Sequence, residues 1–342
     1  MALLTRIYFN AVFGALGGLL GWMLFGVFAD RNQLADDSKG VFWLALLFGG
    51  VLIGGAIGYF VVSVEAWRDR SLLRFVRLSS YGVILGALGG AIGMVAAEWV
   101  NFEVNRLLIG MKVDPGGAIG FLMGAFARGL GWMCLGAAVG VSEGIAARSL
   151  GKLSYGTLGG TIGGFVGGAF FGGVFLATRD MGAAASPWEA VGLVILGACI
   201  GSLSAFVQGV FQPASVKVMR GWQEGREYPL EKRENLLGRD EHADIALFRD
   251  MKVEKRHAVI QRQGNVYYLV NNGSPAEWTR VNEEPVRDQC VLHDGDRIQL
   301  GNVLLRFQMR AAQARGQGPG VRGRRRPYAS SAPDPFPQTI RP

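Results

Sequence analysis

The sequence predicts a membrane protein in two parts: an all-α bundle of six transmembrane helices over residues 1–212 and an all-β sandwich over residues 227–310. Composition is the first reason, because 41 of the 52 glycines precede residue 213, among Leu, Val, Ile, Phe, Ala and Met, whereas the rest of the chain is polar and charged. Six long apolar runs in the first part and short alternating runs in the second are the other two reasons. Residues 213–226 are assigned to a linker and residues 311–342 to a tail.

The six apolar runs cover residues 8–29, 41–64, 80–100, 117–142, 156–178 and 188–211. Each has roughly the 20 residues that a helix needs to cross a hydrocarbon core of about 30 Å. The first run is as long as the others and no small-residue cleavage site follows it, which argues against a cleaved signal peptide. We therefore expect six membrane crossings.

The distribution of Lys and Arg between the loops predicts the orientation. The N-terminus and segments 65–79, 143–155 and 212–220 carry nine basic residues, and the opposite loops carry five together with six acidic residues. We expect both termini in the cytoplasm and the helices in the inner membrane of a bacterial cell.

Three copies of one motif indicate an internal repeat. The motif reads "GALGGLLG" at 14–21, "GALGGAIG" at 86–93 and "GTLGGTIG" at 156–163, with spacings of 72 and 70 residues. The second and fourth runs end alike, in "VSVEAWRDRS" (62–71) and "GVSEGIAARS" (140–149), and Gln208 stands at the matching place in the sixth. The pattern predicts three helical hairpins with rough threefold pseudosymmetry.

Glycines at every fourth position predict how the helices pack. In the fifth run they share one helical face, at Gly156, Gly160, Gly164, Gly168 and Gly172. Lipid provides no hydrophobic drive between helices, so rows of small residues that let two backbones approach stabilise the contact. We interpret this face as a glycine zipper, which indicates packing and not transport.

Polar residues at membrane depth are few. Arg128 lies inside the fourth run, and we expect it to extend to the lipid headgroups; the alternative is that it faces a cavity. Glu65 and Glu143, at cytoplasmic helix ends, are expected to pair with Arg70 and Arg148 of neighbouring hairpins. The sequence contains no Walker motif, no metal-ligand cluster and no catalytic constellation, so we expect neither an enzyme nor a cofactor or metal site.

The β part carries a set of motifs in a known order. They are Gly238–Arg239, Arg256–His257–Ala258, Gly273–Ser274, Thr279–Asn282 and "LHDGDRIQLG" (292–301). In order and spacing this region resembles the forkhead-associated (FHA) domains, which bind phosphothreonine. The resemblance implies an antiparallel sandwich over residues 227–310.

The resemblance transfers the family's functional residues in part. It implies that Arg239 helps to hold a phosphate, that His257 buttresses the binding loops and that Lys255 supplies the basic residue after the family's serine. Glu254 replaces that serine. Glu277 and Trp278 precede Thr279 where the family has an asparagine, in a loop that is one residue longer.

Glu254 changes the chemistry expected of the pocket. A phosphate carries about −1.5 to −2 charges near neutral pH, and a nearby carboxylate costs a few kcal/mol unless a cation intervenes. An ionised carboxylate also donates no hydrogen bond. Three outcomes stay open: Glu254 pairs with Arg239 and makes the domain a phosphate-independent binding module, the domain has lost its ligand, or it binds phosphothreonine by another geometry.

These observations together predict a membrane-anchored adaptor that presents a protein-binding domain in Ser/Thr-phosphorylation signalling. The alternative is a transporter or channel that the FHA-like domain regulates. The expected partners are a protein, phosphorylated on threonine if the pocket is active, within a Ser/Thr kinase pathway, and the lipid bilayer. The basic, Gly- and Pro-rich tail is expected to be disordered, with "RGRRR" (322–326) contacting anionic lipid and not nucleic acid.

Overall fold

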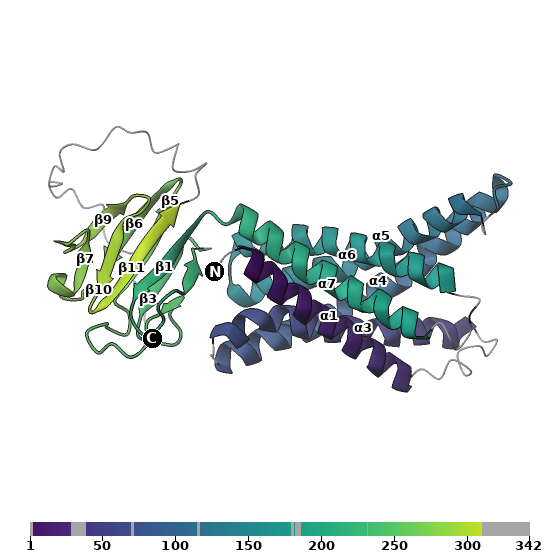
Figure 1. Ribbon diagram of the computed structural model, residues 1–342, viewed down its shortest axis with the longest axis horizontal. Coiled ribbons are helices and arrows are strands. Elements are labelled where there is room, and N and C mark those ends of the chain that lie inside the picture. The colour runs from purple at the N-terminus through teal and green to yellow at the C-terminus, as the bar shows by residue number, and fades with distance from the viewer. Residues whose placement is uncertain are drawn as a thin grey trace, which may run out of the picture.

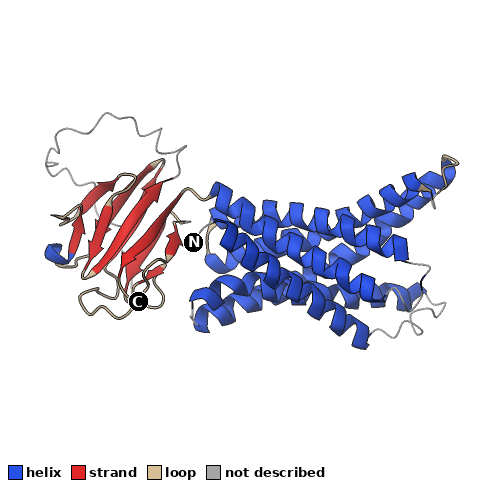
Figure 2. Ribbon diagram, viewed as in Figure 1, coloured by secondary structure: helices blue, strands red, loops and turns tan. Residues whose placement is uncertain are grey.

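The computed structural model describes residues 3–28, 39–69, 72–114, 117–178, 181, 186–230 and 232–309. These form a helical part and a β-sheet part, and the β part lies beyond one end of the helices (Figures 1 and 2). The predicted tail 311–342, Arg70 and the side chain of Glu65 lie outside the described residues.

Six of the described helices are long and apolar enough to cross a membrane, in agreement with the six predicted runs. They are α1 (Leu3–Phe28), α3 (Lys39–Asp69), α4 (Leu72–Gly110), α5 (Ala118–Ala147), α6 (Leu150–Thr178) and α7 (Ser186–Phe211). Each packs beside its neighbours in chain order, and α1 packs against α7, so the helices form a closed ring. The side chain of Leu3 lies beside Gly209, which places the start of α1 at the same end of the ring as the β part (Figure 1).

The repeated glycine motif occupies the same position in each third of the ring. Within every copy, the first and fifth residues face the preceding helix and the fourth and eighth face the following one. On α1 these pairs are Gly14/Gly18 against α7 and Gly17/Gly21 against α3; on α4, Gly86/Gly90 against α3 and Gly89/Gly93 against α5; on α6, Gly156/Gly160 against α5 and Gly159/Gly163 against α7. The repeat is therefore visible as equivalent helix contacts.

The five glycines that the sequence placed on one face of α6 all meet α5. At Gly160 and Gly164, a Cβ atom would lie less than 3.0 Å from the carbonyl oxygens of Gly136 and Trp132. At Gly172, a Cβ atom would lie 2.9 Å from Cβ of Arg128. The two backbones are thus closer than any larger residue permits without displacement.

Apolar side chains fill the middle of the ring. Ile57 of α3, Leu135 of α5 and Ile200 of α7 have no exposed surface and belong to one core cluster. Each stands eight residues before one of the matched residues Glu65, Glu143 and Gln208, so the three occupy equivalent places in the repeat. The described interior at this level is packed with hydrocarbon.

Arg128 does not extend to the lipid headgroups, and that expectation was wrong. It is 8% exposed, its Nη2 lies 3.3 Å from Glu98 Oε2 on α4, and its guanidinium carbon lies 4.4 Å from the centre of the Phe175 ring. The reason is the absence of a side chain at Gly172, which leaves room on α6 for the methylene groups of the arginine. The charge is held between helices by an ion pair and a cation–π contact.

Glu143 connects three helices at the end of the ring next to the β part. Its Oε2 accepts a hydrogen bond from Nε2 of Gln208 on α7, and Oε1 of Gln208 accepts one from Nη2 of Arg6 on α1 at 2.7 Å. The predicted partners of Glu143 were Arg70 and Arg148. Arg70 lies outside the described residues, and the contact described here joins Glu143 to α7 and, through Gln208, to Arg6.

Replacing Glu98 by Gln is expected to lower the free energy of unfolding of the bundle by about 1–3 kcal/mol. The change leaves the buried Arg128 charge without its counter-ion, and an uncompensated buried charge is costly. Glu103→Gln is the matched control, because Glu103 and Arg106 form an exposed pair at 4.0 Å whose loss should change stability by less than about 0.5 kcal/mol. Thermal unfolding in one detergent compares the two variants, and equal stability of the two would contradict this role of Glu98.

The β part is a sandwich of two sheets, as predicted. One has the strand order β2-β1-β11-β10-β7-β8 and the other β4-β3-β5-β6-β9. The strands are β1 (Ala214–Arg220), β2 (Glu227–Pro229), β3 (Glu234–Gly238), β4 (Ile245–Ala246), β5 (Ala258–Gln263), β6 (Val266–Asn271), β7 (Thr279–Val281), β8 (Glu284–Pro285), β9 (Gln289–Leu292), β10 (Arg297–Leu300) and β11 (Val303–Met309). Alternate residues such as Val216, Leu237, Ile260 and Phe307 meet in the core between the sheets.

The linker predicted over residues 213–226 is wrong in its first half. Residues 214–220 form strand β1, which pairs with β11 from Ala214↔Met309 to Arg220↔Leu304 and also with β2. Val216 and Val218 are buried, whereas Lys217 between them faces outward, which is the alternation of a half-buried strand. Two residues, Gln212 and Pro213, separate α7 from the sandwich, so the domain is joined closely to the last helix.

Candidate functional site

The predicted site residues gather on loops at one end of the sandwich. The N–H of Arg239, in the β3–β4 loop, donates to the carbonyl oxygen of Glu254 in the β4–β5 loop at 2.9 Å. His257 Nε2 lies 2.9 Å from Oγ1 of Thr279, which follows the β6–β7 loop that contains Glu277. Three loops distant in sequence are therefore tied together by the residues that the motifs singled out.

These loops lie at the ends of the strands opposite the α7–β1 junction. Strand β1 starts two residues after α7 and ends at Arg220, opposite Leu304. Beside that end, the N–H of Gly301 donates to the carbonyl oxygen of Trp278 at 2.8 Å. The loop that carries Glu277 and Trp278 is consequently a strand's length away from the α7–β1 junction (Figure 1).

His257 is the centre of this loop arrangement. It has no exposed surface, and its Nδ1 accepts a hydrogen bond from the N–H of Glu254 at 3.0 Å. Because Nδ1 is an acceptor, Nε2 carries the proton of the neutral ring and donates it to Oγ1 of Thr279. Burial lowers the pKa of His257 below its usual range, against the opposing effect of the nearby Glu254 carboxylate.

Acidification below about pH 6.5, the ordinary pKa of histidine, is expected to destabilise the β-sandwich. The lowered pKa of folded His257 means that the unfolded chain takes up the proton first, so stability present above pH 6.5 is lost as the pH falls toward the folded value. Urea unfolding at pH 7.5 and pH 5.5 measures the loss. His257→Gln should flatten this dependence, and an unchanged pH dependence in that variant would exclude His257 as its source.

Gly238 allows the first two loops to approach. A Cβ at this position would lie less than 3.0 Å from the carbonyl oxygen of Lys255. The same stretch of backbone forms the bonds from Arg239 and Asp240 to the carbonyl oxygens of Glu254 and Lys255. A glycine before Arg239 is therefore required by this close contact.

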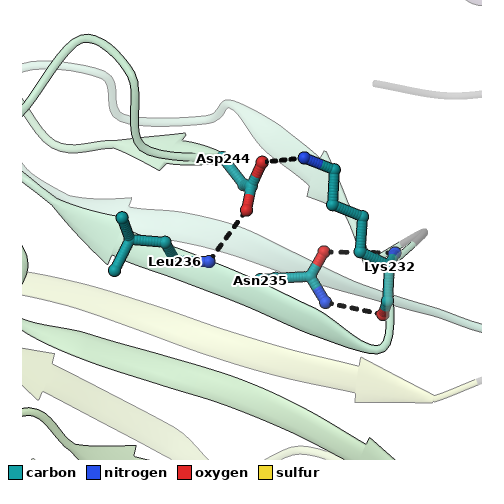
Figure 3. Close-up of polar contacts among 4 residues, drawn as sticks. All are labelled: Lys232, Asn235, Leu236 and Asp244. Atoms are coloured by element: carbon teal, nitrogen blue, oxygen red, sulfur yellow. Dashed lines mark hydrogen bonds and ion pairs between the residues drawn. The ribbon is translucent and has the colours of Figure 1, made fainter. Parts of the chain in front are cut away.

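Side chains to which the sequence assigned no role also brace the loops, among them Ser274 of the Gly273–Ser274 motif. Asn272 Nδ2 donates to the carbonyl oxygen of Arg256 at 3.0 Å, and Ser274 Oγ donates to that of His257 at 3.1 Å. Figure 3 shows a second brace, in which Asp244 accepts from the N–H of Leu236 at 3.0 Å and from Lys232 Nζ at 2.6 Å. Short polar residues beside a glycine or at a strand end are typical of turns with side-chain-to-backbone hydrogen bonds. This pattern was the signal in the sequence from which these contacts could have been predicted.

The sandwich has relatives of known identity. A family model described as the inner membrane component of the type III secretion system (T3SS), cytoplasmic domain, matches residues 217–311. Two solved FHA domains are each 33% identical to the matched part of this chain. The first comes from a study of phosphothreonine-dependent FHA domain interactions; it covers 29% of this chain and 97% of its own, with a TM-score of 0.26. The second is the FhaA FHA domain complexed with the intracellular domain of Rv3910; it covers 28% of this chain and 99% of its own, with a TM-score of 0.25.

Among curated proteins, the oxoglutarate dehydrogenase inhibitor of Corynebacterium jeikeium is 36% identical over 104 residues, which are 30% of this chain and 70% of that protein. The chain belongs to the FHA family. The transcriptional regulatory protein EmbR of Mycobacterium tuberculosis is 33% identical over 87 residues, 25% of this chain and 22% of that regulator. The matched residues lie in the C-terminal part, so the FHA domain is fused to a helical region.

The loops to which the FHA resemblance assigns phosphate binding depart from the family pattern. Glu254 and Lys255 are exposed, and Arg239 Nη1 lies 2.8 Å from Sδ of Met251. Within the described residues no ion pair joins Arg239 to Glu254, contrary to the idea that the two fill the pocket together. Glu254 is thus exposed, and Arg239 is engaged by Met251.

The longer loop before Thr279 forms a turn of 3-10 helix, Ala276–Trp278. Glu277 is exposed there, and its carbonyl oxygen accepts a hydrogen bond from Arg280 Nε at 3.1 Å. The extra residue is thus absorbed in a compact turn that exposes Glu277, one of the two residues that the resemblance sets in place of the family's asparagine.

Proposed function

We propose that the protein is a membrane-anchored adaptor whose helices hold the FHA domain at the cytoplasmic face of the inner membrane, where the domain binds a protein partner in Ser/Thr-phosphorylation signalling. The cytoplasmic, inner-membrane description of the matching family model supports this location. The excess of basic residues in one set of loops, and the shared end of α1 and the β part, agree with it. Apolar packing at Ile57, Leu135 and Ile200 favours an anchor over a transport path.

The observation that carries the proposal is an intact loop scaffold with altered chemistry. His257, Thr279 and Gly238 hold the loops together, whereas Glu254 and Glu277 put carboxylates where the family has neutral hydrogen-bond donors. The contacts that hold the loops together are present, but the side chains expected to contact a phosphate differ from those of the family. This combination is consistent with a surface that binds protein with little dependence on phosphothreonine. The glycine contacts of α6 with α5 act, in this proposal, as a zipper that keeps the anchor rigid.

Phosphothreonine peptides test the proposal directly. The full-length protein, reconstituted in nanodiscs, is titrated by calorimetry with a phosphothreonine peptide library and its unphosphorylated counterpart. We expect no phosphate-dependent binding at micromolar concentration by the native protein. Glu254→Ser with Glu277→Asn should produce such binding, because each change removes repulsion and adds a donor, and charge-assisted hydrogen bonds contribute about 1.5–3 kcal/mol each.

Arg239→Ala in the doubly substituted protein is the control. If Arg239 holds the phosphate, this third substitution should abolish the gained affinity and leave the unphosphorylated peptide unaffected. Micromolar, phosphate-dependent binding by the native protein would show instead that the carboxylates are compatible with an active phosphothreonine pocket.

A further inference from the structure

The outer face of the sheet that contains β1, β11 and β10 carries a row of basic residues. Arg306 on β11 is directly opposite Lys217 on β1 and Arg297 on β10. On each strand the residue next to the cation, namely Val216, Leu305 or Ile298, is buried in the core. Because side chains alternate between the two faces of a strand, the three cations share the outward face. Like charges directly opposite one another on a sheet are destabilising, and only Lys217 also has an acidic residue, Glu227 of β2, on its other side.

Two of these residues also line a cleft. The cleft has a volume of about 570 Å³ and is bordered by Arg220, Arg297 and Arg306, by the apolar Met219 and Leu304, and by one acidic residue, Glu224. Arg297 and Arg306 are exposed, and Arg220 Nε donates to the carbonyl oxygen of Asn302 at 3.4 Å. Across the described ranges, no ion pair joins these arginines to an acidic side chain. Three guanidinium groups around apolar side chains match a ligand that carries both carboxylates or phosphates and hydrocarbon.

The surface continues from the cleft to the loops of the candidate site. Trp222, two residues after Arg220, is 51% exposed, and the guanidinium carbon of Arg249 lies 4.7 Å from its ring centre. Met251, 79% exposed, follows in the same loop and touches Arg239. Exposed Trp, Met and Arg are the residues enriched at protein interfaces.

The position of this surface favours a protein over a lipid headgroup. Arg220 and Trp222 lie at the end of β1 that is farthest from α7, whereas a bilayer surrounds the helices at the other end. Trp222 and Met251 therefore adjoin the loop that carries Arg239, where a ligand of the FHA domain would lie, and this neighbourhood favours a protein ligand.

We propose that this cleft binds an acidic segment of a partner protein, with its carboxylates on Arg220, Arg297 and Arg306 and an apolar residue against Trp222. The inference deepens the proposed function in that it assumes a protein ligand. It is independent of the phosphothreonine loops, because none of the cleft residues belongs to them.

The test uses the full-length protein in nanodiscs of zwitterionic lipid and a fluorescent dodecapeptide of Glu, Gly and Leu, with a Gln-for-Glu peptide as the neutral probe. Fluorescence anisotropy should show binding of the acidic peptide that weakens with salt. Arg297→Gln with Arg306→Gln should weaken it about tenfold. Arg233→Gln with Arg287→Gln removes the same charge from exposed positions outside the cleft and should change affinity less than about twofold.

Folding is checked in the same samples. Removing the like-charged neighbours should leave the melting temperature of the FHA domain unchanged or raise it by about 1–4 °C. If the melting temperature does not fall, weaker binding reports the loss of the arginines and not unfolding. If it does fall, Trp222→Ala, which changes no charge, should still weaken binding.

Two results would overturn the proposal. An equal loss in the Arg233/Arg287 variant would mean attraction by net charge alone. The second result is that Arg297→Gln with Arg306→Gln weakens binding to vesicles containing phosphatidylglycerol but leaves binding of the acidic peptide unchanged. That result would assign the cleft to lipid. Glu254→Ser with Glu277→Asn must leave the acidic-peptide affinity unchanged, so a failure of the phosphothreonine prediction is distinguishable from a failure of the cleft.

Discussion

Replacing Gly164 by alanine is expected to lower the free energy of unfolding of the helix bundle by about 2–4 kcal/mol, toward the upper end of overpacking effects. The added Cβ would lie less than 3.0 Å from the carbonyl oxygen of Trp132, and backbone on both sides leaves no flexible atom to move aside. Gly164→Leu should be worse, because a larger side chain has to separate α6 from α5 altogether.

Gly173→Ala is the matched control on the same helix. Its Cβ would have one neighbour, Cζ of Phe121 at 3.6 Å, which is ordinary van der Waals contact. Both substitutions gain similar helix propensity, up to about 1 kcal/mol, so their difference isolates the interhelical contact. Detergent thermal stability measured for both variants decides, and equal melting temperatures would mean that Gly164 does not face α5.

His257→Ala is expected to cost the FHA domain about 3–5 kcal/mol of its free energy of unfolding. It removes a ring with no exposed surface and leaves the N–H of Glu254 and the hydroxyl of Thr279 without their partner. A cavity and two unsatisfied buried groups each contribute to the loss. Urea unfolding followed by the fluorescence of Trp222 and Trp278 measures it.

His242→Ala provides the comparison for this effect. His242 is in the neighbouring loop, and its side chain is 76% exposed and contacts Asp240 at 2.9 Å. Its loss should change stability by less than about 1 kcal/mol. A similar cost for the two histidines would contradict the central position of His257.

Length and periodicity were enough to predict the six helices and the sandwich, because both depend on local patterns of apolar residues. The glycine face of α6 was predictable for the same reason, since residues four apart share a side of a helix. Strand β1 was missed because the change of composition at Pro213 hides a short alternating stretch whose partner, β11, lies some 90 residues away in sequence.

Individual side-chain contacts were beyond the sequence because residues distant in the chain decide them. Arg128 turns inward since α6 has Gly172 at that level, and Glu98 on α4 supplies the charge. Arg239 contacts Met251 and not Glu254, because the path of the β4–β5 loop brings Met251 next to the arginine. The motif residues themselves, His257 and Thr279, were found because a family pattern fixes their spacing.

Partner capture with and without phosphorylation tests the central claim most directly, namely that the FHA domain binds protein at the membrane without requiring phosphothreonine. Full-length protein in nanodiscs is incubated with lysate of its own cells that has been treated with either a Ser/Thr kinase or a phosphatase, and captured proteins are quantified by mass spectrometry. The account predicts the same partners in both lysates, reduced by Arg297→Gln with Arg306→Gln. Capture from the kinase-treated lysate alone, abolished by Arg239→Ala, would contradict it.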